Sequence, residues 1–255
     1  MLYDKKLWYY LTMIKFDIIT IFPEIFSSYF SESILKRAQE KKLIKINIHD
    51  LRQWSQGRHK QVDDRPYGGG PGMILMVEPI TGALNDLKAM SYELRAKSKK
   101  AQSSKPKAQS RIIMLTPAGK KFTQREAERL AKYDQLVLLC GRYEGFDARV
   151  DKLVDEKLSI GDYVLAGGEL PAMVVVEAVS RQIPGVVGHE HALDEETFSQ
   201  SLDYIEYPQY TRPETFKMPI AGRQSPMARV PKILLSGDHA KIKEWRRKQA
   251  KNKPI

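Results

Sequence analysis

The segment from Leu158 to Pro171 is apolar enough to be buried, yet it carries three glycines and one proline. A buried loop has to pair its own peptide groups, and glycine allows the main chain to turn sharply and to approach a ligand closely. Such residue types suit a small-molecule pocket whose contacts come from main chain rather than side chains. They also suit a tight turn between two core strands, and this segment alone leaves both interpretations open.

Two further segments favour the pocket. Residues 111–120 have the sequence RIIMLTPAGK, and residues 136–145 have the sequence LVLLCGRYEG. Each pattern is typical of a buried parallel strand that ends in a loop. Ligands of open α/β sheets bind beyond the carboxyl ends of the strands. We therefore expect the three loops to converge on one ligand.

Several familiar site patterns do not match. No G-x-G-x-x-G motif follows a strand, and Gly119-Lys120 is followed by Lys121 rather than by the Ser or Thr of a P-loop. His189-Glu190-His191 has the residue types of a metal site, but a solvated linker is favoured because no Cys or further His stands nearby. We predict no metal site from these residues.

The hydrophobic pattern places strands and helices around the three loops. An apolar run predicts a strand at residues 16–22, and alternation of apolar and polar residues predicts one at 43–48, in addition to the strands that precede the loops. Helical spacing predicts helices at residues 25–40, 78–90, 123–132, 148–154, 171–181 and 242–248. Alternation of strands and helices indicates an α/β domain with a parallel sheet.

Composition and charge indicate which kinds of binding partner and which cellular location suit the chain. The 255 residues allow one large domain or two smaller ones, and the net charge of +11 indicates a polyanion or an anionic membrane surface. No run of about 18 apolar residues is long enough to span a bilayer. The single cysteine, Cys140, excludes an intrachain disulfide and fits a reducing, cytoplasmic location. It ends an apolar strand and is expected to be a buried, inert thiol.

Charge also suggests how the chain is divided. The lysine-rich stretch near residues 95–110 is interpreted as a flexible surface insertion. Residues 189–201 are polar and are interpreted as an interdomain linker. From Lys217 to the end, 11 Lys or Arg residues stand against two acidic residues, which predicts a basic helical domain at residues 202–255 that binds RNA phosphates.

The three loops occur in order with other long motifs. These are IKFDIITIFP at residues 14–23, DDRPYGGGPGM at 63–73, RQIPGV at 181–186, YPQYTRPE at 207–214 and Trp245-Arg246. In these motifs the chain closely resembles the bacterial tRNA (guanine-N1)-methyltransferases, members of the SPOUT superfamily of knotted methyltransferases. The resemblance covers nearly the whole chain from residue 13, so it implies that residues 1–12 are an N-terminal extension.

The resemblance implies a parallel-sheet domain at residues 13–188 with a deep C-terminal trefoil knot, followed by a small, mainly helical domain. It implies S-adenosyl-L-methionine as cofactor, tRNA as partner, and a homodimer with composite active sites and no membrane contact. A requirement for Mg²⁺ stays open. The implied cofactor-binding residues are Pro117, Gly119, Gly141, Tyr143, Glu144, Gly145, Ile160, Gly161, Tyr163, Leu165, Gly167, Gly168 and Pro171.

The run from Gly68 to Gly72 is either a floppy turn or part of a base-binding site. The charged and aromatic residues that precede it suit an extruded base, and the resemblance favours this second interpretation. The implied substrate-binding residues are Asp63, Arg65, Tyr67 and Gly69.

The implied reaction is methylation of N1 of the guanine immediately 3′ of the anticodon. Guanine N1 carries a proton, so a general base is needed, and a cation near O6 would stabilise the charge that develops. The family's arginine matches Arg181. Its catalytic aspartate matches Glu196, so the residue here is a glutamate, with Asp194 and Asp203 as alternatives. A SPOUT ribose 2′-O-methyltransferase and a non-catalytic RNA-binding or assembly factor remain the alternative functions.

Overall fold

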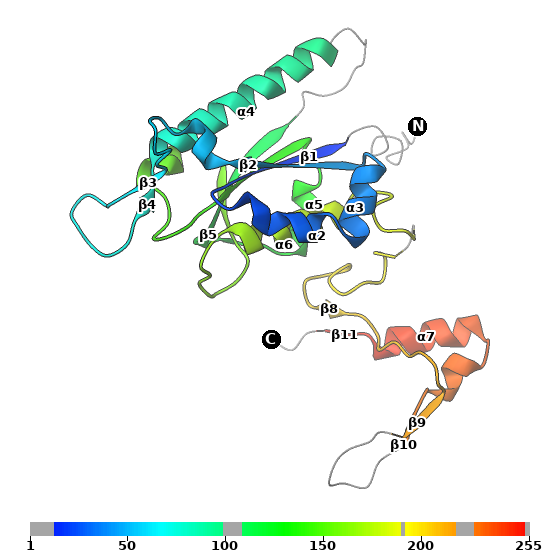
Figure 1. The fold of residues 1–255 in the computed structure, drawn as a ribbon. Helices are drawn as coiled ribbons and strands as arrows, with labels where there is room; N and C mark the ends of the chain where they lie inside the picture. Colours follow the sequence, from blue (N-terminus) through cyan, green and yellow to red (C-terminus); the bar gives the residue numbers. More distant parts are fainter. Residues whose placement is uncertain (1–12, 99–108, 190–191, 218–226, 253–255) are drawn as a thin grey trace. The chain divides into compact units, whose positions relative to one another are not determined.

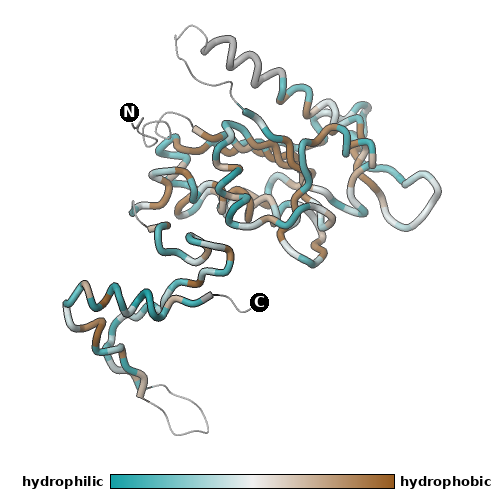
Figure 2. Tube along the Cα trace, turned by 180° about the vertical axis from the view of Figure 1, so that it is seen from behind, coloured by the Kyte–Doolittle hydropathy of each residue, from teal (hydrophilic) through white to brown (hydrophobic). Residues whose placement is uncertain are grey.

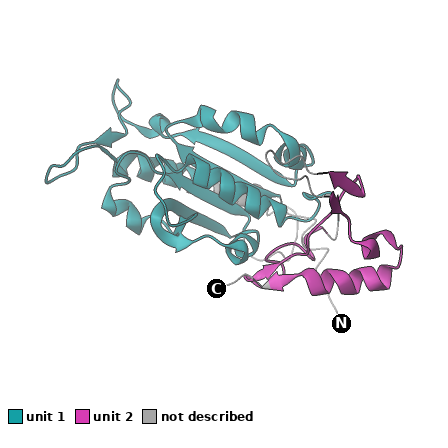
Figure 3. Cartoon of the chain, turned by 90° about the horizontal axis from the view of Figure 1, so that it is seen from below, with its two compact units in different colours: residues 1–190 teal, residues 191–255 magenta. Residues whose placement is uncertain are grey.

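The computed structural model describes residues 13–98, 109–189, 192–217 and 227–252, and of residues 89–98 and Asn252 it describes the backbone alone (Figure 1). The chain divides into two compact units, residues 1–190 and residues 191–255 (Figure 3). Each unit is described by itself. The predicted extension at residues 1–12 and most of the lysine-rich insertion lie outside the described residues.

Unit 1 is built on a five-stranded parallel sheet with the order β2-β1-β6-β5-β7. This confirms the predicted α/β class with a parallel sheet. The strands are β1 (Ile14–Thr20), β2 (Ile44–Asp50), β5 (Ser110–Lys121), β6 (Gln135–Cys140) and β7 (Glu156–Ser159). Apolar residues concentrate on these central strands (Figure 2).

Side chains alternate across the sheet and form two separate cores. On one face Phe16 and Ile18 pack with the helices α2 (Ser27–Phe30), α3 (Ser33–Glu40), α5 (Gln124–Leu130) and α6 (Glu169–Arg181). On the other face Ile19 packs with α4 (Val77–Ser98) and with the 3₁₀ helices η2 (Leu51–Trp54) and η3 (Ala148–Lys152). Unit 1 is therefore a three-layer α/β/α structure.

Two of the predicted helices differ in the structure. The helix predicted at residues 25–40 consists of η1 (Pro23–Phe26), α2 and α3, because the chain bends before Ser33, whose φ is +48°. The helix predicted near residues 148–154 is the short 3₁₀ helix η3. In addition, α4 continues to Ser98, beyond the predicted end at residue 90 and into the expected insertion.

The prediction for the first of the three loops, that it follows the end of a strand, is also wrong. The segment Thr116-Pro117-Ala118-Gly119 does not follow a strand; it interrupts β5, whose register against β7 shifts between Leu115 and Lys120. A Cβ at Gly119 would lie 2.6 Å from the backbone of Leu158. The glycine therefore allows β5 to resume pairing with β7 after the interruption.

The short hairpin of β3 (Asp63–Asp64) and β4 (Ile74–Leu75) carries the glycine-rich segment between its strands. Unit 2 contains two antiparallel pairs that the pattern did not predict, β8 (Tyr204–Ile205) with β11 (Lys251–Asn252) and β9 (Thr215–Lys217) with β10 (Met227–Arg229). It also contains η4 (Lys232–Leu235) and α7 (His239–Gln249). Helix α7 begins before the predicted residue 242, because Asp238 caps it by accepting a hydrogen bond from Lys241 N at 3.1 Å.

The buried carboxylate of Asp17 is the centre of a polar cluster on β1. Its Oδ1 accepts hydrogen bonds from Asn47 at 2.8 Å and from His49 Nε2 at 2.9 Å. Its Oδ2 accepts one from Gln135 at 2.7 Å and lies 3.1 Å from Lys15 Nζ. Burial alone would raise the pKa of Asp17, but these hydrogen bonds and the charge of Lys15 outweigh it and hold the pKa below its ordinary value.

Candidate functional site

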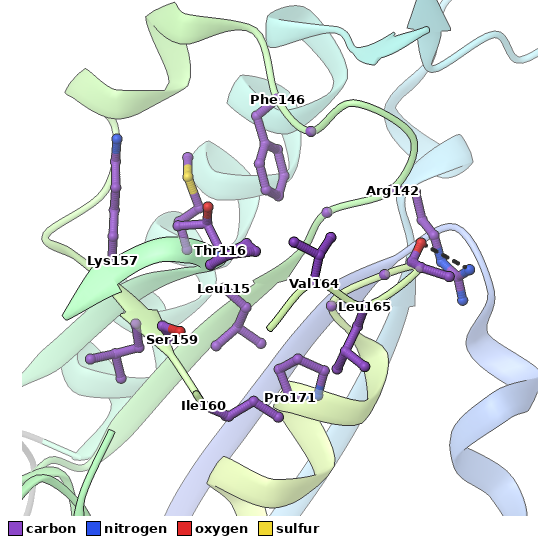
Figure 4. A pocket seen from close by; sticks show the side chains of 18 of the residues that line it. Leu115, Thr116, Arg142, Phe146, Lys157, Ser159, Ile160, Val164, Leu165 and Pro171 are labelled. Atoms are coloured by element: carbon purple, nitrogen blue, oxygen red, sulfur yellow. Dashed lines mark hydrogen bonds between the residues drawn. The ribbon is translucent and has the colours of Figure 1, made fainter. Parts of the chain in front are cut away.

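A cavity of about 450 Å³ opens beside the interruption of β5, where β6 and β7 end and α6 begins (Figure 4). This size is within the range of small-molecule sites. The cavity lies at the carboxyl ends of parallel strands, where α/β sheets bind ligands. Its lining comes from residues 114–117, 141–146, 157–161 and 163–168, with Ala148, Asp151 and Pro171.

The three predicted segments therefore meet around one cavity. Every residue that the sequence suggests as a cofactor contact lines it, except Gly119, which packs against β7 instead. Sequence reasoning missed the side chains that complete the wall, among them Thr116, Phe146, Asp151 and Lys157. Lys157 directly precedes Leu158 in the sequence, and this adjacency to a predicted cavity segment was the only signal that it would line the cavity.

The cavity combines apolar side chains with main-chain groups. Leu115, Ile160, Leu165 and Pro171 project around its lower part in Figure 4. The glycines of the two later loops leave peptide groups accessible between them. Such a site can hold a flat heterocycle between apolar side chains and hydrogen-bond its edges through main chain. It fits the nucleoside part of S-adenosyl-L-methionine.

Two of the glycines serve the packing of the loops. A Cβ at Gly168 would lie 2.7 Å from Cys140 Cα and 2.8 Å from Gly141 N. Gly168 N also donates a hydrogen bond to Gly141 O at 2.9 Å. A larger residue at position 168 would separate the loops after β6 and β7. If Gly168→Val weakened ligand binding, the displaced loops would explain the loss as well as the space that valine takes from the ligand.

Tyr143 ties the cavity to the hairpin that carries the glycine-rich segment. Its φ is +58°, an uncommon value outside glycine. Burial and a hydrogen bond to Asp63 raise the pKa of the Tyr143 hydroxyl, against the opposing charges of nearby arginines. Glu144 N also donates to Met73 O at 3.1 Å. Asp63 therefore touches the cavity wall, although it does not line the cavity.

The other expected substrate contacts are on the surface. Arg65, Tyr67 and Gly69 lie in the segment between β3 and β4, and the Tyr67 side chain is fully exposed. Gly68, Gly69, Gly70 and Gly72 all have positive φ values, which only glycine adopts without strain. None of these residues lines the cavity.

The expected catalytic pair is divided between the units. Arg181 is the last residue of α6 in unit 1. Glu196 lies in a turn of unit 2, where its carbonyl accepts a hydrogen bond from Ser199 N at 2.9 Å; Asp194 and Asp203 belong to the same unit. That Arg181 and Glu196 meet in one active site stays a prediction.

Other candidate groups have ordinary structural roles. Cys140 is buried, and desolvation raises the pKa of its thiol well above the ordinary value, so it is a poor nucleophile. Among the described residues, no group of three or more His, Cys, Asp or Glu side chains could hold a metal ion. Within the same residues, no helix has the length and apolar character needed to cross a membrane.

Comparison with known proteins gives a consistent result. Residues 14–255 match the family model described as tRNA (Guanine-1)-methyltransferase TrmD. The tRNA (guanine-N(1)-)-methyltransferase of Dictyoglomus turgidum is 46% identical over 241 residues, which is 94% of this chain and 86% of the relative. The corresponding proteins of Geobacter sp. strain M21 and Carboxydothermus hydrogenoformans are 45% and 47% identical, with 92% of this chain and 84% and 82% of the relatives covered.

Proposed function

The chain belongs to the tRNA (guanine-1)-methyltransferase family, and we propose from this premise that it methylates N1 of the guanine immediately 3′ of the anticodon in tRNA. The observation that carries the proposal in the structure is the glycine-rich cavity at the interruption of β5 and the ends of β6 and β7. S-adenosyl-L-methionine supplies the methyl group on a sulfonium when it is bound there.

Residues of the chain would supply the remaining chemistry. The carboxylate of Glu196 takes the proton from guanine N1, and the guanidinium of Arg181 stabilises the negative charge that builds up toward O6. Methyl transfer is an in-line displacement, so much of the rate comes from holding the base and the methyl group in position. The hairpin segment around Asp63 would hold the base, which a ribose 2′-O-methyltransferase does not require.

We also propose that the chain is threaded as a deep trefoil knot after Gly141. Two observations support this. Strand β6 lies between β1 and β5 although it follows both in sequence. The chain after β7 then returns to β6, where Gly168 N bonds to Gly141 O at 2.9 Å.

Unit 2 is proposed to bind tRNA phosphates. Helix α7 carries Lys241, Lys243, Arg246, Arg247 and Lys248 against one acidic residue. Arg246 lies over the ring of Tyr207, 4.8 Å from its centroid, which leaves a cation and an aromatic face together on the surface. Such a combination suits contacts to RNA. The substrate and the single buried thiol are consistent with a cytoplasmic enzyme.

A homodimer is the proposed assembly. Phe22, Ile25, Leu170 and Val174 are exposed apolar side chains, and η1 contacts α6 within the unit. Together they form an apolar surface at the start of α6 of the kind that marks an interface. A second copy is the proposed occupant, because the resemblance implies a homodimer whose active sites combine residues of both subunits.

Mixed dimers test this assembly. Arg181→Ala and Glu196→Ala homodimers should each be nearly inactive, and activity should return after the two proteins are mixed and allowed to exchange subunits. One site of each mixed dimer would then contain both native residues. Sedimentation that shows a stable, fully active monomer would contradict the assembly.

Leu165→Arg should weaken binding of S-adenosyl-L-methionine about tenfold or more. The Leu165 side chain lines the cavity and is 36% exposed, so the change should fill the cavity with a long, charged side chain without disturbing the core. Isothermal titration calorimetry measures the effect. Leu235→Arg, at an exposed site in unit 2 that does not line the cavity, is the control; equal affinities in the two variants would count against the site.

A further inference from the structure

Glu169, the first residue of α6, lies behind the wall of the cavity rather than in its lining. Its side chain is 2% exposed, and a carboxylate so deeply buried needs compensating partners. Oε1 accepts a hydrogen bond from Thr20 Oγ1 at 2.7 Å. Oε2 lies 2.9 Å from Arg142 Nε. One carboxylate therefore joins the end of β1, the loop after β6 and the start of α6.

Arg142 carries this link into the cavity wall. Its guanidinium lies over the ring of Phe22, 4.6 Å from the centroid, and its Nη1 donates a hydrogen bond to Ala166 O at 3.4 Å, drawn as a dashed line in Figure 4. Its backbone also pairs with Gly167. Arg142 thus holds the loop after β6 against the loop after β7, and Glu169 holds Arg142.

The neighbouring residues are shaped around this ion pair. A Cβ at Gly167 would collide with Arg142 Nε and lie 2.5 Å from Glu169 Oε2. The glycine at position 167 therefore leaves room for the ion pair. On the other side, the Thr20 hydroxyl accepts a hydrogen bond from Phe22 N at 2.9 Å while it donates to Glu169. The Thr20 hydroxyl therefore also fixes the segment that follows β1.

We propose that Glu169 is a positioning residue, which through Thr20 and Arg142 keeps the two cavity loops at the separation that cofactor binding needs. The inference rests on the proposed cofactor, S-adenosyl-L-methionine. The contact between Arg142 and Glu169 is an ion pair without an aligned hydrogen bond. Its strength therefore depends on the carboxylate charge, which Glu169→Gln removes while it keeps the side-chain shape and the acceptor for Thr20.

The test compares Glu169→Gln and Thr20→Val with the wild-type protein by calorimetry with S-adenosyl-L-methionine and by steady-state kinetics. We expect both variants to bind the cofactor about 10- to 100-fold more weakly. The KM for the cofactor should rise while the KM for tRNA stays unchanged, because only the cofactor loops are loosened. Thr20→Ser keeps the hydroxyl and should restore wild-type affinity.

Glu126→Gln is the matched control. Glu126 is a buried carboxylate on α5 that pairs with Lys120 at 2.6 Å and with Arg129 at 2.7 Å, and it does not line the cavity. Its loss should lower the melting temperature without changing cofactor affinity. If Glu169→Gln and Glu126→Gln lose affinity alike, in proportion to their melting temperatures, Glu169 is merely structural and the inference is overturned.

The remaining outcomes separate the inference from the proposed function. If the wild-type protein binds S-adenosyl-L-methionine and both Glu169→Gln and Thr20→Val bind it equally well, the inference fails and the function stands. If the wild-type protein does not bind it, both fail. Where Glu169→Gln does not fold, the comparison of Thr20→Val with Thr20→Ser decides, since equal affinities in that pair also overturn the inference.

Discussion

Replacing Glu196 by glutamine should slow single-turnover methyl transfer by roughly 10²–10⁴-fold. Glutamine keeps the size and the hydrogen-bonding shape of the side chain but cannot take the proton from guanine N1. Cofactor affinity should stay nearly unchanged, because the cavity is built entirely from unit 1 residues. Rapid quenching of enzyme in excess over tRNA measures the chemical step directly.

Conservative changes nearby identify the base. Glu196→Asp should keep most of the activity, because the carboxylate remains and a turn can absorb the loss of one methylene group. Asp194→Asn and Asp203→Asn should have small effects. A severe loss in Asp203→Asn beside a normal Glu196→Gln enzyme would move the role to Asp203 and show that the resemblance is misaligned across residues 189–201.

Asp17→Ala should lower the free energy of unfolding at neutral pH by about 3–5 kcal/mol. The change removes a buried carboxylate that accepts hydrogen bonds from three side chains and pairs with Lys15, and it leaves those donors without their acceptor. Urea unfolding at fixed protein concentration measures the loss. Asp162→Ala removes a highly exposed partner of Lys121 and should change stability little.

The contribution of Asp17 should also depend on pH in a defined direction. Its pKa is lower in the folded protein than in the unfolded chain, so the stabilisation is complete above the unfolded value of about 3.9 and is lost as the pH falls through the folded value. The difference between wild type and Asp17→Ala should therefore shrink only under strongly acidic conditions. A difference below about 1 kcal/mol at neutral pH would mean that Lys15 and His49 find other partners or water.

The parallel sheet could be predicted because a run of apolar residues in the local sequence marks most of its strands. The runs that became β1 and β6 are mostly apolar, so their class followed from the pattern alone, whereas β7 has the sequence EKLS and carries no such signal. The bend before Ser33 and the interruption of β5 could not be predicted. The first depends on an unusual φ value, and the second depends on pairing with β7, which lies far away in sequence.

Some features of the candidate site could likewise be predicted from the sequence, and others could not. Its glycine-rich loops were visible in the sequence, because composition marks places where main chain can approach a ligand. The roles of individual residues were not visible. Gly119 and Gly168 pack against neighbouring backbone, and Glu169 joins Thr20 and Arg142 across long separations in sequence. Long-range partners of this kind appear only when the chain is folded.

The most direct measurement of the central claim is analysis of the methylated nucleoside after incubation of the protein with S-adenosyl-L-methionine and an unmodified tRNA transcript. The account predicts 1-methylguanosine at the guanine immediately 3′ of the anticodon, and no product when adenosine replaces that guanine. A 2′-O-methylated nucleoside, or no methyl transfer by a protein that binds the tRNA, would contradict it.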